Sequence, residues 1–344
     1  MSRLIEQIAE LTAFRDRDAL DFSLASALRE LLRPESIAIY RVVGAAGERR
    51  WLLRSRVGGS GAEAAADSLW SDLETLPALA ALPHHALCLQ GSRIVPLAGA
   101  PALTLFPLAA DGEAMGVLEV RAPQPLAGDA QQLVCAILRI YRNFQGLLDY
   151  SERDTLTGLL NRKTFDECFA RIAAGAAGSA EGAAAVPDPR RAAAPGVAAM
   201  GVVDIDHFKR VNDSFGHLIG DEVLLVLSRL MRATFRHHDG LFRFGGEEFV
   251  VLMRCRAEVD ACVALERLRT AVEQHAFPRV GHITISAGLA RVRPGDTPTA
   301  CFERADQAIY YAKQNGRNRL CDYDELVAQG LLADRSHASD LELF

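Results

Sequence analysis

Residues 241–253 read LFRFGGEEFVVLM, and this stretch decides how the C-terminal half of the chain folds. Apolar runs on both sides of a Gly-Gly pair predict two β-strands joined by a tight hairpin turn. Because glycine has no side chain, a bulky ligand can approach the backbone at Gly245 and Gly246. Glu247 and Glu248 follow at once, and such carboxylates can bind a hard cation or accept a proton. The turn is therefore a candidate meeting point of phosphates and a metal ion, although a plain hairpin followed by solvated acids has the same local sequence.

Three further blocks accompany this hairpin. Residues 202–213 read VVDIDHFKRVND, where an apolar run predicts a buried strand that ends at an acid. Residues 154–162 read DTLTGLLNR, and residues 311–319 read YAKQNGRNR. The four blocks, in this order, resemble the GGDEF family of diguanylate cyclases over about residues 150–325.

Composition sets the broad class of the protein. The chain has 344 residues, of which 49% are hydrophobic, so it is long enough for two folded domains. The net charge is −6 and no basic stripe is visible, which argues against a nucleic-acid polymer as partner. The seven cysteines show no Cys-x-x-Cys spacing, as expected for reduced thiols in a cytoplasmic protein. No signal peptide and no apolar run long enough to span a membrane is found, so no membrane association is expected.

The N-terminal part, residues 1–130, is expected to form a separate domain. Its periodicity predicts a helix within 4–32, strands at 36–43 and 50–57, and a hairpin over 103–120 with an Asp-Gly turn. This order resembles a GAF domain, a bacterial sensory module whose ligand the sequence does not identify. A PAS-like or purely structural α/β module would give a similar pattern.

Residues 131–153 are expected to form a helical, coiled-coil-like linker between the two domains. Apolar residues alternate there by four and three positions, namely Leu133, Ile137, Ile140, Phe144 and Leu147. This spacing suits a parallel two-stranded coil, and it equally suits an amphipathic helix packed on its own domain.

Residues 154–325 are expected to form the output domain, followed by a weakly ordered tail at 326–344. A stretch rich in Ala, Gly and Pro, residues 173–199, is expected to be a flexible surface loop. The remaining periodicity predicts a strand at 200–205, a helix at 221–235, a hairpin at 241–253, a helix at 258–275, a strand at 282–291, a helix at 299–315 and a strand at 319–323. The order βαββαβ matches a ferredoxin-like palm with one extra helix and strand, so the whole chain is assigned to the α/β (α+β) class.

The resemblance implies roles for the acidic residues. Asp204, the carbonyl of Ile205, Glu247 and Glu248 would bind Mg²⁺. Glu247 is also the candidate base for the ribose 3′-hydroxyl, and the sequence does not separate these two roles. Taken alone, Asp204 could instead be an acid that begins a turn.

The resemblance also implies a nucleotide site. The alternative, purely structural interpretation is that its charged residues lie at solvated helix ends and that its histidine has a structural role. Positive charge at a helix C-terminus complements the helix dipole, and an acid at a helix start does the same at the other end. The residues expected to bind GTP are Phe208, Lys209, Lys313 and Arg317 at the phosphates, Asn212 and Asp221 at guanine, His217 as a further contact, and the Gly245–Gly246 turn.

A second candidate site precedes the hairpin. Arg236 and Asp239 have the Arg-x-x-Asp spacing that the family uses for inhibitory product binding, and Arg267 resembles a secondary arginine of such a site. A guanidinium can bind a guanine edge or a phosphate in fork geometry. A solvated charged turn would have the same sequence.

The sequence as a whole predicts a GAF-like sensor joined to a diguanylate cyclase that acts as a homodimer. Two GTP molecules would yield cyclic di-GMP and two pyrophosphates, with cyclic di-GMP as inhibitor. The alternatives are a non-catalytic receptor of cyclic di-GMP and a cyclase that uses another nucleotide. A haem or bilin site at Cys88, His84 and His85 is a weaker interpretation than three structural residues.

Overall fold

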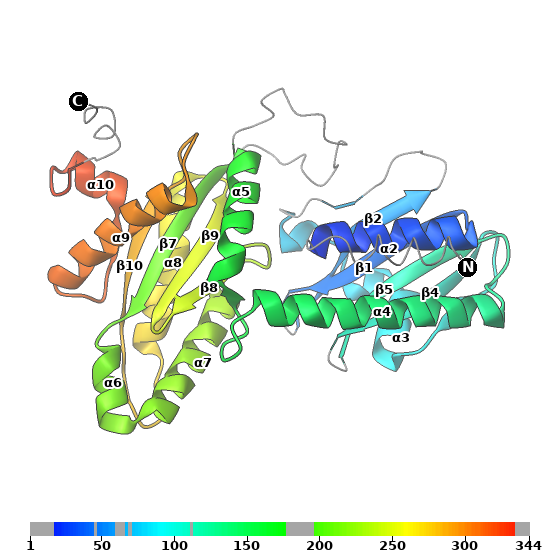
Figure 1. Cartoon of the computed structure of the whole chain (residues 1–344), viewed down its shortest axis with the longest axis horizontal. Helices are drawn as coiled ribbons and strands as arrows, with labels where there is room; N and C mark the ends of the chain where they lie inside the picture. The colour runs from blue at the N-terminus through cyan, green and yellow to red at the C-terminus, as the bar shows by residue number, and fades with distance from the viewer. Residues whose placement is uncertain are drawn as a thin grey trace. The chain divides into compact units, whose positions relative to one another are not determined.

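The structure is a computed structural model that describes residues 17–44, 47–58, 66–67, 71–110, 113–176 and 196–333 (Figure 1). These residues divide into two compact units, one that ends at Ser151 and one that begins at Glu152. The start of the predicted N-terminal helix, the Asp-Gly turn at 111–112 and most of the 173–199 stretch lie outside the described residues.

The first unit is built on a five-stranded antiparallel sheet with the order β2-β1-β5-β4-β3. Its strands are β1 (Ser36–Val43), β2 (Arg50–Gly58), β3 (Val95–Leu97), β4 (Ala102–Ala110) and β5 (Glu113–Ala122). Its helices are α2 (Arg17–Leu32), α3 (Pro83–Gly91) and α4 (Gly128–Glu152), with short 3₁₀ helices at Leu73–Thr75 and Leu79–Ala81. The expected strands and hairpin are therefore present.

Each face of this sheet has its own apolar core. On one face, Leu24 of α2 and Val134 of α4 pack with Phe106 of β4. On the other face, Cys88 of α3 packs with Trp51 of β2. The unit thus has three layers, with α2 and α4 on one side of the sheet and α3 on the other. Cys88 belongs to the apolar core, as its structural interpretation expects.

The expected seam on α4 is divided between two surfaces. Ile137 is buried in the core of the first unit, and Leu133 and Phe144 pack against that core. Leu147 is 67% exposed. Tyr141, which the apolar pattern left out, is buried and completes the inner face. Of the two alternatives for this helix, packing on its own sheet accounts for most of its length.

A buried polar cluster ties α4 to the other elements of its unit. Asp21 of α2 accepts hydrogen bonds from Arg41 Nη2 and Arg54 Nε, both at 3.2 Å, and from the hydroxyl of Tyr141. Gln145 Nε2 donates to the same hydroxyl at 3.0 Å. Burial opposes ionisation of Asp21, but the two arginines and Tyr141 together hold its pKa below the usual value.

The second unit is built on a six-stranded sheet with the order β11-β10-β7-β9-β8-β6. Its strands are β6 (Leu160–Asn161), β7 (Val197–Ile205), β8 (Gly240–Gly245), β9 (Glu248–Cys255), β10 (Ile285–Arg291) and β11 (Leu320–Asp322). Its helices are α5 (Phe165–Ala176), α6 (Phe208–Phe215), α7 (His217–Thr234), α8 (Glu258–Gln274), α9 (Pro298–Gln314) and α10 (Tyr323–Ala328), with a 3₁₀ helix at Arg162–Thr164. The central strands β10-β7-β9-β8 are antiparallel and have the order of a βαββαβ ferredoxin-like core.

Helices cover both faces of this sheet (Figure 1). Leu227 of α7 and Leu265 of α8 lie in one core with Val203 and Val251 of the central strands. On the other side, α9 packs so closely on β10 that a β-carbon at Gly288 would lie 2.1 Å from the carbonyl oxygen of Ala305. Gly288 therefore sets how near α9 comes to the sheet.

Several predicted boundaries are corrected by the structure. The helix expected at 221–235 begins at His217, after α6, because Gly216 at φ 83° turns the chain between the two helices. The last central strand begins at Ile285 instead of 282. The tail expected from 326 is helical up to Ala328, because Asp322 caps α10 and Leu326 is buried. Residues 334–344 lie outside the described residues.

Candidate functional site

Three carboxylates meet at one end of the central strands. Asp204 of β7 lies opposite Glu248 of β9 in the antiparallel register, and Glu247 precedes Glu248 at the hairpin turn. Asp204 is 5% exposed, whereas Glu247 is half-buried and Glu248 exposed. The predicted acidic residues are thus brought together at one edge of the sheet, although Asp204 precedes the other two by about forty positions in the sequence.

Burial and the neighbouring acids raise the pKa of Asp204 and of Glu247. Burial raises the pKa of Asp204, with Glu248 and Asp206 adding to the effect and Lys313 opposing it. Burial and then the charge of Asp204 raise the pKa of Glu247. A cation placed among these groups would relieve the repulsion, so the edge has the electrostatics of a cation site. A carboxylate with a raised pKa is also a better proton acceptor.

Lys313, in the last turn of α9, supplies a positive charge at this edge. Its Nζ lies 2.9 Å from Oδ2 of Asp204. The side chain of Lys313 is 34% exposed, so its ammonium group is accessible from solvent. The predicted phosphate ligand therefore lies directly beside the predicted metal ligand.

The oxygen donors at this edge are of the kind that Mg²⁺ prefers. Among the described residues, no three side chains of His, Cys, Asp or Glu stand together as a ready metal-binding group. The oxygen donors present are the carboxylates of Asp204, Glu247 and Glu248, and Mg²⁺ commonly combines one or two carboxylates with substrate phosphates. The edge therefore fits a metal ion whose coordination a phosphate would complete.

The Gly-Gly turn is open to solvent, and hydrogen bonds from Arg243 fix its backbone. A β-carbon at Gly245 or Gly246 would meet nothing within 4 Å, and Gly246 has φ 49°. The guanidinium of Arg243 donates to the carbonyl of Gly246 from Nη2 at 2.9 Å, and its Nη1 pairs with Asp154 at 3.1 Å. Asp154 in turn accepts from the backbone N–H of Thr157 at 2.8 Å.

Arg243 and Asp154 are residues to which the sequence assigned no role. Both stand in motif blocks, but only their pairing across the fold shows that they support the turn. Burial opposes ionisation of Asp154, yet bonds from Thr157 and Arg243 hold its pKa below the usual value. The block at 154–162 thereby fixes the hairpin turn that carries Glu247.

The residues expected at guanine lie where α6 meets α7. A β-carbon at Gly220 would lie 2.0 Å from Oδ1 of Asn212, so glycine is needed for Asn212 to pack there. Asp221 follows Gly220 and is half-buried, whereas His217 is exposed as the first residue of α7. The predicted helix began at residue 221, whereas α7 begins at His217. Asp221 therefore lies inside the helix and not at its start.

The residues expected to cradle phosphate after β7 are helical. α6 begins at Phe208, so Phe208 and Lys209 form its first turn. Phe208 is buried and Lys209 exposed. The side chain of Phe208 therefore belongs to the core, and only its backbone N–H, at the start of the helix, could meet a phosphate.

Arg236, Asp239 and Arg267 line one small cavity of about 120 Å³. The backbone N–H of Arg236 donates to Asp239 Oδ2 at 2.8 Å, and Arg267 donates to the carbonyl of Thr234. Burial raises the pKa of Asp239 to about 6, although Arg236 opposes the shift. The three residues predicted for a regulatory site are thus neighbours.

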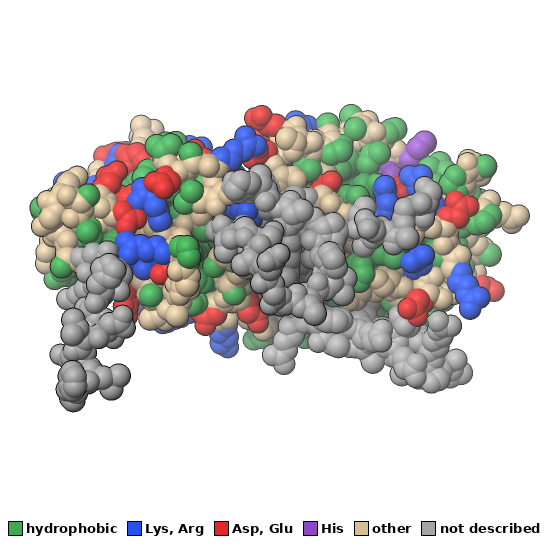
Figure 2. All heavy atoms as spheres, turned by 90° about the horizontal axis from the view of Figure 1, so that it is seen from above, with side chains coloured by type: hydrophobic (Ala, Val, Ile, Leu, Met, Phe, Trp, Pro, Cys, Tyr) green, Lys and Arg blue, Asp and Glu red, His purple; other side chains and the backbone are tan. Residues whose placement is uncertain are grey.

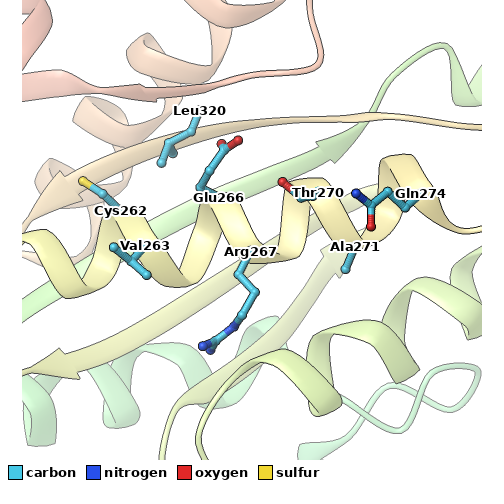
Figure 3. Close-up of a pocket in the computed structure, with 8 residues that line it drawn as sticks. All are labelled: Cys262, Val263, Glu266, Arg267, Thr270, Ala271, Gln274 and Leu320. Carbon is cyan, nitrogen blue, oxygen red and sulfur yellow. The ribbon is translucent and has the colours of Figure 1, made fainter.

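A larger groove of about 740 Å³ runs along α8 and shares Arg267 with this cavity (Figure 3). Val263 lines both hollows as well, and in Figure 3 the side chain of Arg267 points away from Glu266 and Leu320. The groove contains none of the acidic edge residues. Its size alone does not make it the reaction site, because Asp204, Glu247, Glu248 and Lys313 are not among the residues that line it.

On the face shown in Figure 2, acidic and basic side chains of the described residues are interspersed. No helix among the described residues is long and apolar enough to cross a lipid bilayer.

Comparison with known proteins places this geometry in context. Diguanylate cyclase DgcP of Pseudomonas aeruginosa is 42% identical over 170 residues, which are 48% of this chain and 23% of that protein. Diguanylate cyclase DgcZ of Escherichia coli is 36% identical over 178 residues, 51% of this chain and 54% of that protein. The chain thus spans about half of the second relative and less of the first.

Among solved structures, the GGDEF domain of DgcB from Caulobacter crescentus in complex with c-di-GMP aligns with a TM-score of 0.44 and 31% identity, covering 51% of this chain and 94% of that one. Residues 190–319 match the sequence model of the family described as diguanylate cyclase, GGDEF domain. The second unit of this chain therefore carries a GGDEF domain.

Proposed function

We propose that this protein is a diguanylate cyclase that condenses two GTP molecules into cyclic di-GMP and releases two pyrophosphates. One observation carries the proposal. Within a GGDEF domain, the acids Asp204, Glu247 and Glu248 share one sheet edge with the ammonium of Lys313.

The acidic edge would hold the metal. Asp204, the carbonyl of Ile205, Glu247 and Glu248 are the proposed Mg²⁺ ligands. When bound, the ion supplies charge neutralisation at the triphosphate. The raised pKa of Glu247 supports its second proposed role, which is to accept the proton of the ribose 3′-hydroxyl.

The remaining residues would bind the nucleotide. Lys313 and Arg317 would bind the β- and γ-phosphates, and the first turn of α6 with Lys209 would donate to them. Asn212 and Asp221 would read the guanine edge, with His217 as a further contact. A carboxylate of the site left without a donor disfavours adenine, which lacks the N1–H and 2-amino pair.

The reaction requires two copies of the chain, because one site would hold only one GTP. The 3′-hydroxyl oxygen of each nucleotide would attack the α-phosphorus of the other, with pyrophosphate as the leaving group. The proton of each hydroxyl would pass to the base. A homodimer is therefore part of the proposed mechanism, and the exposed Leu147 and Tyr150 near the end of α4 are available for pairing.

Regulation is proposed at two places. Cyclic di-GMP would bind at Arg236, Asp239 and Arg267 and inhibit. The first unit, with its GAF-like element order, would act as a sensor of an unidentified signal.

The test is incubation of the purified chain with GTP and MgCl₂, followed by chromatography and a pyrophosphate assay. We expect cyclic di-GMP with two pyrophosphates per product molecule, and none from ATP. A variant with Asp204→Asn serves as the inactive control. Binding of cyclic di-GMP without any turnover would instead favour a receptor, and a cyclic product from ATP would change the substrate.

A further inference from the structure

Asp206 is a buried carboxylate that the proposed reaction does not use. It follows β7 directly and is 5% exposed. Its Oδ1 accepts from the hydroxyl of Ser286 at 2.7 Å, and its Oδ2 accepts from the hydroxyl of Thr284 at 2.6 Å. Oδ2 also accepts from the backbone N–H of Asn318 at 3.0 Å. A buried carboxylate with three donors is held in one orientation.

The bond to Asn318 fixes an unusual turn after α9. Three successive residues, Gly316, Arg317 and Asn318, have φ angles of 107°, 61° and 44°. Left-handed conformations are costly for residues other than glycine and persist only where neighbouring contacts enforce them. Here the N–H of Arg317 donates to the carbonyl of Ala312 at 3.0 Å, and the N–H of Asn318 donates to Asp206.

The side chain of Asn318 anchors the same turn to α8. Its Nδ2 donates to Oε1 of Glu273 at 2.7 Å, and its Oδ1 accepts from Nη1 of Arg269 at 2.8 Å. Arg269 is itself paired with Glu273 at 2.8 Å. The turn is therefore held from two directions, by the end of β7 and by α8.

Arg317 belongs to this turn. Asp206, which accepts the hydrogen bond from Asn318, follows Asp204 and Ile205 in the sequence. The hydrogen bond between Asp206 and Asn318 thus joins the segment with the acids to the segment with the phosphate-binding cations. Lys313 and Asp204 form a second tie between the same two segments. A shift of the turn would change the distance between Arg317 and the acidic edge.

We propose that Asp206 and Asn318 are positioning residues that hold Arg317 at the place where it meets the triphosphate of a nucleotide. The inference rests on the proposed function in taking a nucleoside triphosphate as ligand. It adds that selectivity for the triphosphate over the monophosphate depends on two residues that do not touch the nucleotide.

The experiment measures affinity by calorimetry on the full chain with MgCl₂. The probes are α,β-methylene-GTP, whose α–β linkage cannot be cleaved, and GMP. We expect the wild type to prefer the triphosphate analogue. Asp206→Asn should reduce this preference about tenfold or more, since a bond to a charged group is lost and the turn is released. Affinity for GMP should stay within about twofold, because the guanine contacts lie on α6 and α7.

Two further variants separate positioning from folding. Asn318→Gly keeps the left-handed turn and the backbone donor but removes the bonds to α8, so it should reduce the preference while folding normally. Asp322→Asn is the matched control, because Asp322 is also a buried aspartate, 4% exposed, that accepts backbone bonds from the N–H groups of Asp324 and Glu325. It should lower thermal stability and leave the preference unchanged.

An unchanged preference in both Asp206→Asn and Asn318→Gly would overturn the inference, as would equal affinity of the wild type for the two probes. A wild type that binds the analogue but forms no cyclic di-GMP from GTP would refute the proposed function. In that case the nucleotide preference of the variants still decides the role of Asp206 and Asn318.

Discussion

The chemistry of a single residue, Glu247, depends on what surrounds it. The side chain is half-buried at the hairpin turn, and burial and Asp204 both raise its pKa. Either proposed role, metal ligand or base, needs its carboxylate to be ionised at the moment of reaction. Glutamine has nearly the same shape but neither accepts a proton nor carries charge.

Glu247→Gln is therefore expected to lower the rate of cyclic di-GMP formation by a factor of about 100 or more. The measurement is the initial rate at saturating GTP and MgCl₂. Glu222→Gln, an exposed glutamate of α7, makes the same chemical change away from the edge and should be active. A rate for Glu247→Gln within threefold of the wild type would contradict the assignment.

Asp239 gives a prediction about pH. Its pKa of about 6 lies above the ordinary 3.8, so the folded protein binds more protons than the unfolded chain between these values. Stability should therefore fall as the pH rises through this window and stay lower above it. Asp239→Asn should raise the free energy of unfolding of the second unit by about 1–3 kcal/mol at pH 7.5, and should have little effect below pH 4.

Calorimetric unfolding of the wild type and Asp239→Asn at pH 7.5 and below pH 4 tests this prediction. A second measurement is inhibition by added cyclic di-GMP, which Asp239→Asn should lose. Arg236→Ala is the paired variant. It removes a proposed product contact but keeps the buried carboxylate, so inhibition should weaken while the pH dependence remains. Equal stability of wild type and Asp239→Asn at pH 7.5 would show that the carboxylate carries no such cost.

At the scale of elements, the distance between α9 and β10 positions Lys313 over Asp204. A methyl group at Gly288 would lie 2.1 Å from a carbonyl oxygen and 2.5 Å from a backbone nitrogen of α9, and backbone atoms cannot yield easily. Gly288→Ala should therefore destabilise the second unit by about 1–3 kcal/mol and lower activity. Gly146→Ala is the opposite case, because a β-carbon added at Gly146 in α4 would meet nothing within 4 Å.

We expect Gly146→Ala to stabilise the first unit by about 0.5–1 kcal/mol through helix propensity. Differential scanning calorimetry with an activity assay compares the two variants. If Gly288→Ala were as stable and as active as the wild type, the close packing of α9 would not be what holds Lys313 in place.

The elements that sequence predicted well are those with strong local signals. The hairpin around Gly245, the strand before Asp204 and the helix capped by Thr297 all appear at or near their predicted positions. The GGDEF domain that these blocks indicated is confirmed by the family match. These features could be predicted because glycine pairs, apolar runs and cap residues act through their nearest neighbours in the chain.

The missed features depend on contacts between distant residues. The start of α7 at His217 follows from the turn at Gly216, and α10 is stabilised by the burial of Tyr323. The pairing of Arg243 with Asp154 and the bond from Asn318 to Asp206 join segments far apart in the sequence. Neither pair has a spacing rule from which it could be recognised in advance.

At the scale of the whole molecule, the proposed reaction needs two chains. Leu147 is 67% and Tyr150 80% exposed on α4, and large apolar groups exposed together often mark an interface. Specific activity should fall on dilution. The double variant Leu147→Gln, Tyr150→Gln should raise the protein concentration needed for half of the maximal specific activity by about tenfold or more, because each buried apolar side chain contributes about 1.5–3 kcal/mol.

Light scattering at the same concentrations reports the oligomeric state independently. Leu87→Gln, a change of the same kind at a residue of α3 that is 45% exposed, is the control and should have no effect. A specific activity that stays flat across the range in which the dimer dissociates would refute the requirement for two chains.

The contact between Lys313 and Asp204 has a consequence for the sequence of events at the site. The ammonium group of Lys313 lies on one flank of the carboxylate of Asp204, 2.9 Å from Oδ2. A free metal ion arriving alone must compete with a tethered cation that never diffuses away. A nucleoside triphosphate with its bound metal ion offers Lys313 a stronger anionic partner and delivers the ion in the same encounter, so metal and nucleotide are expected to bind as a single complex.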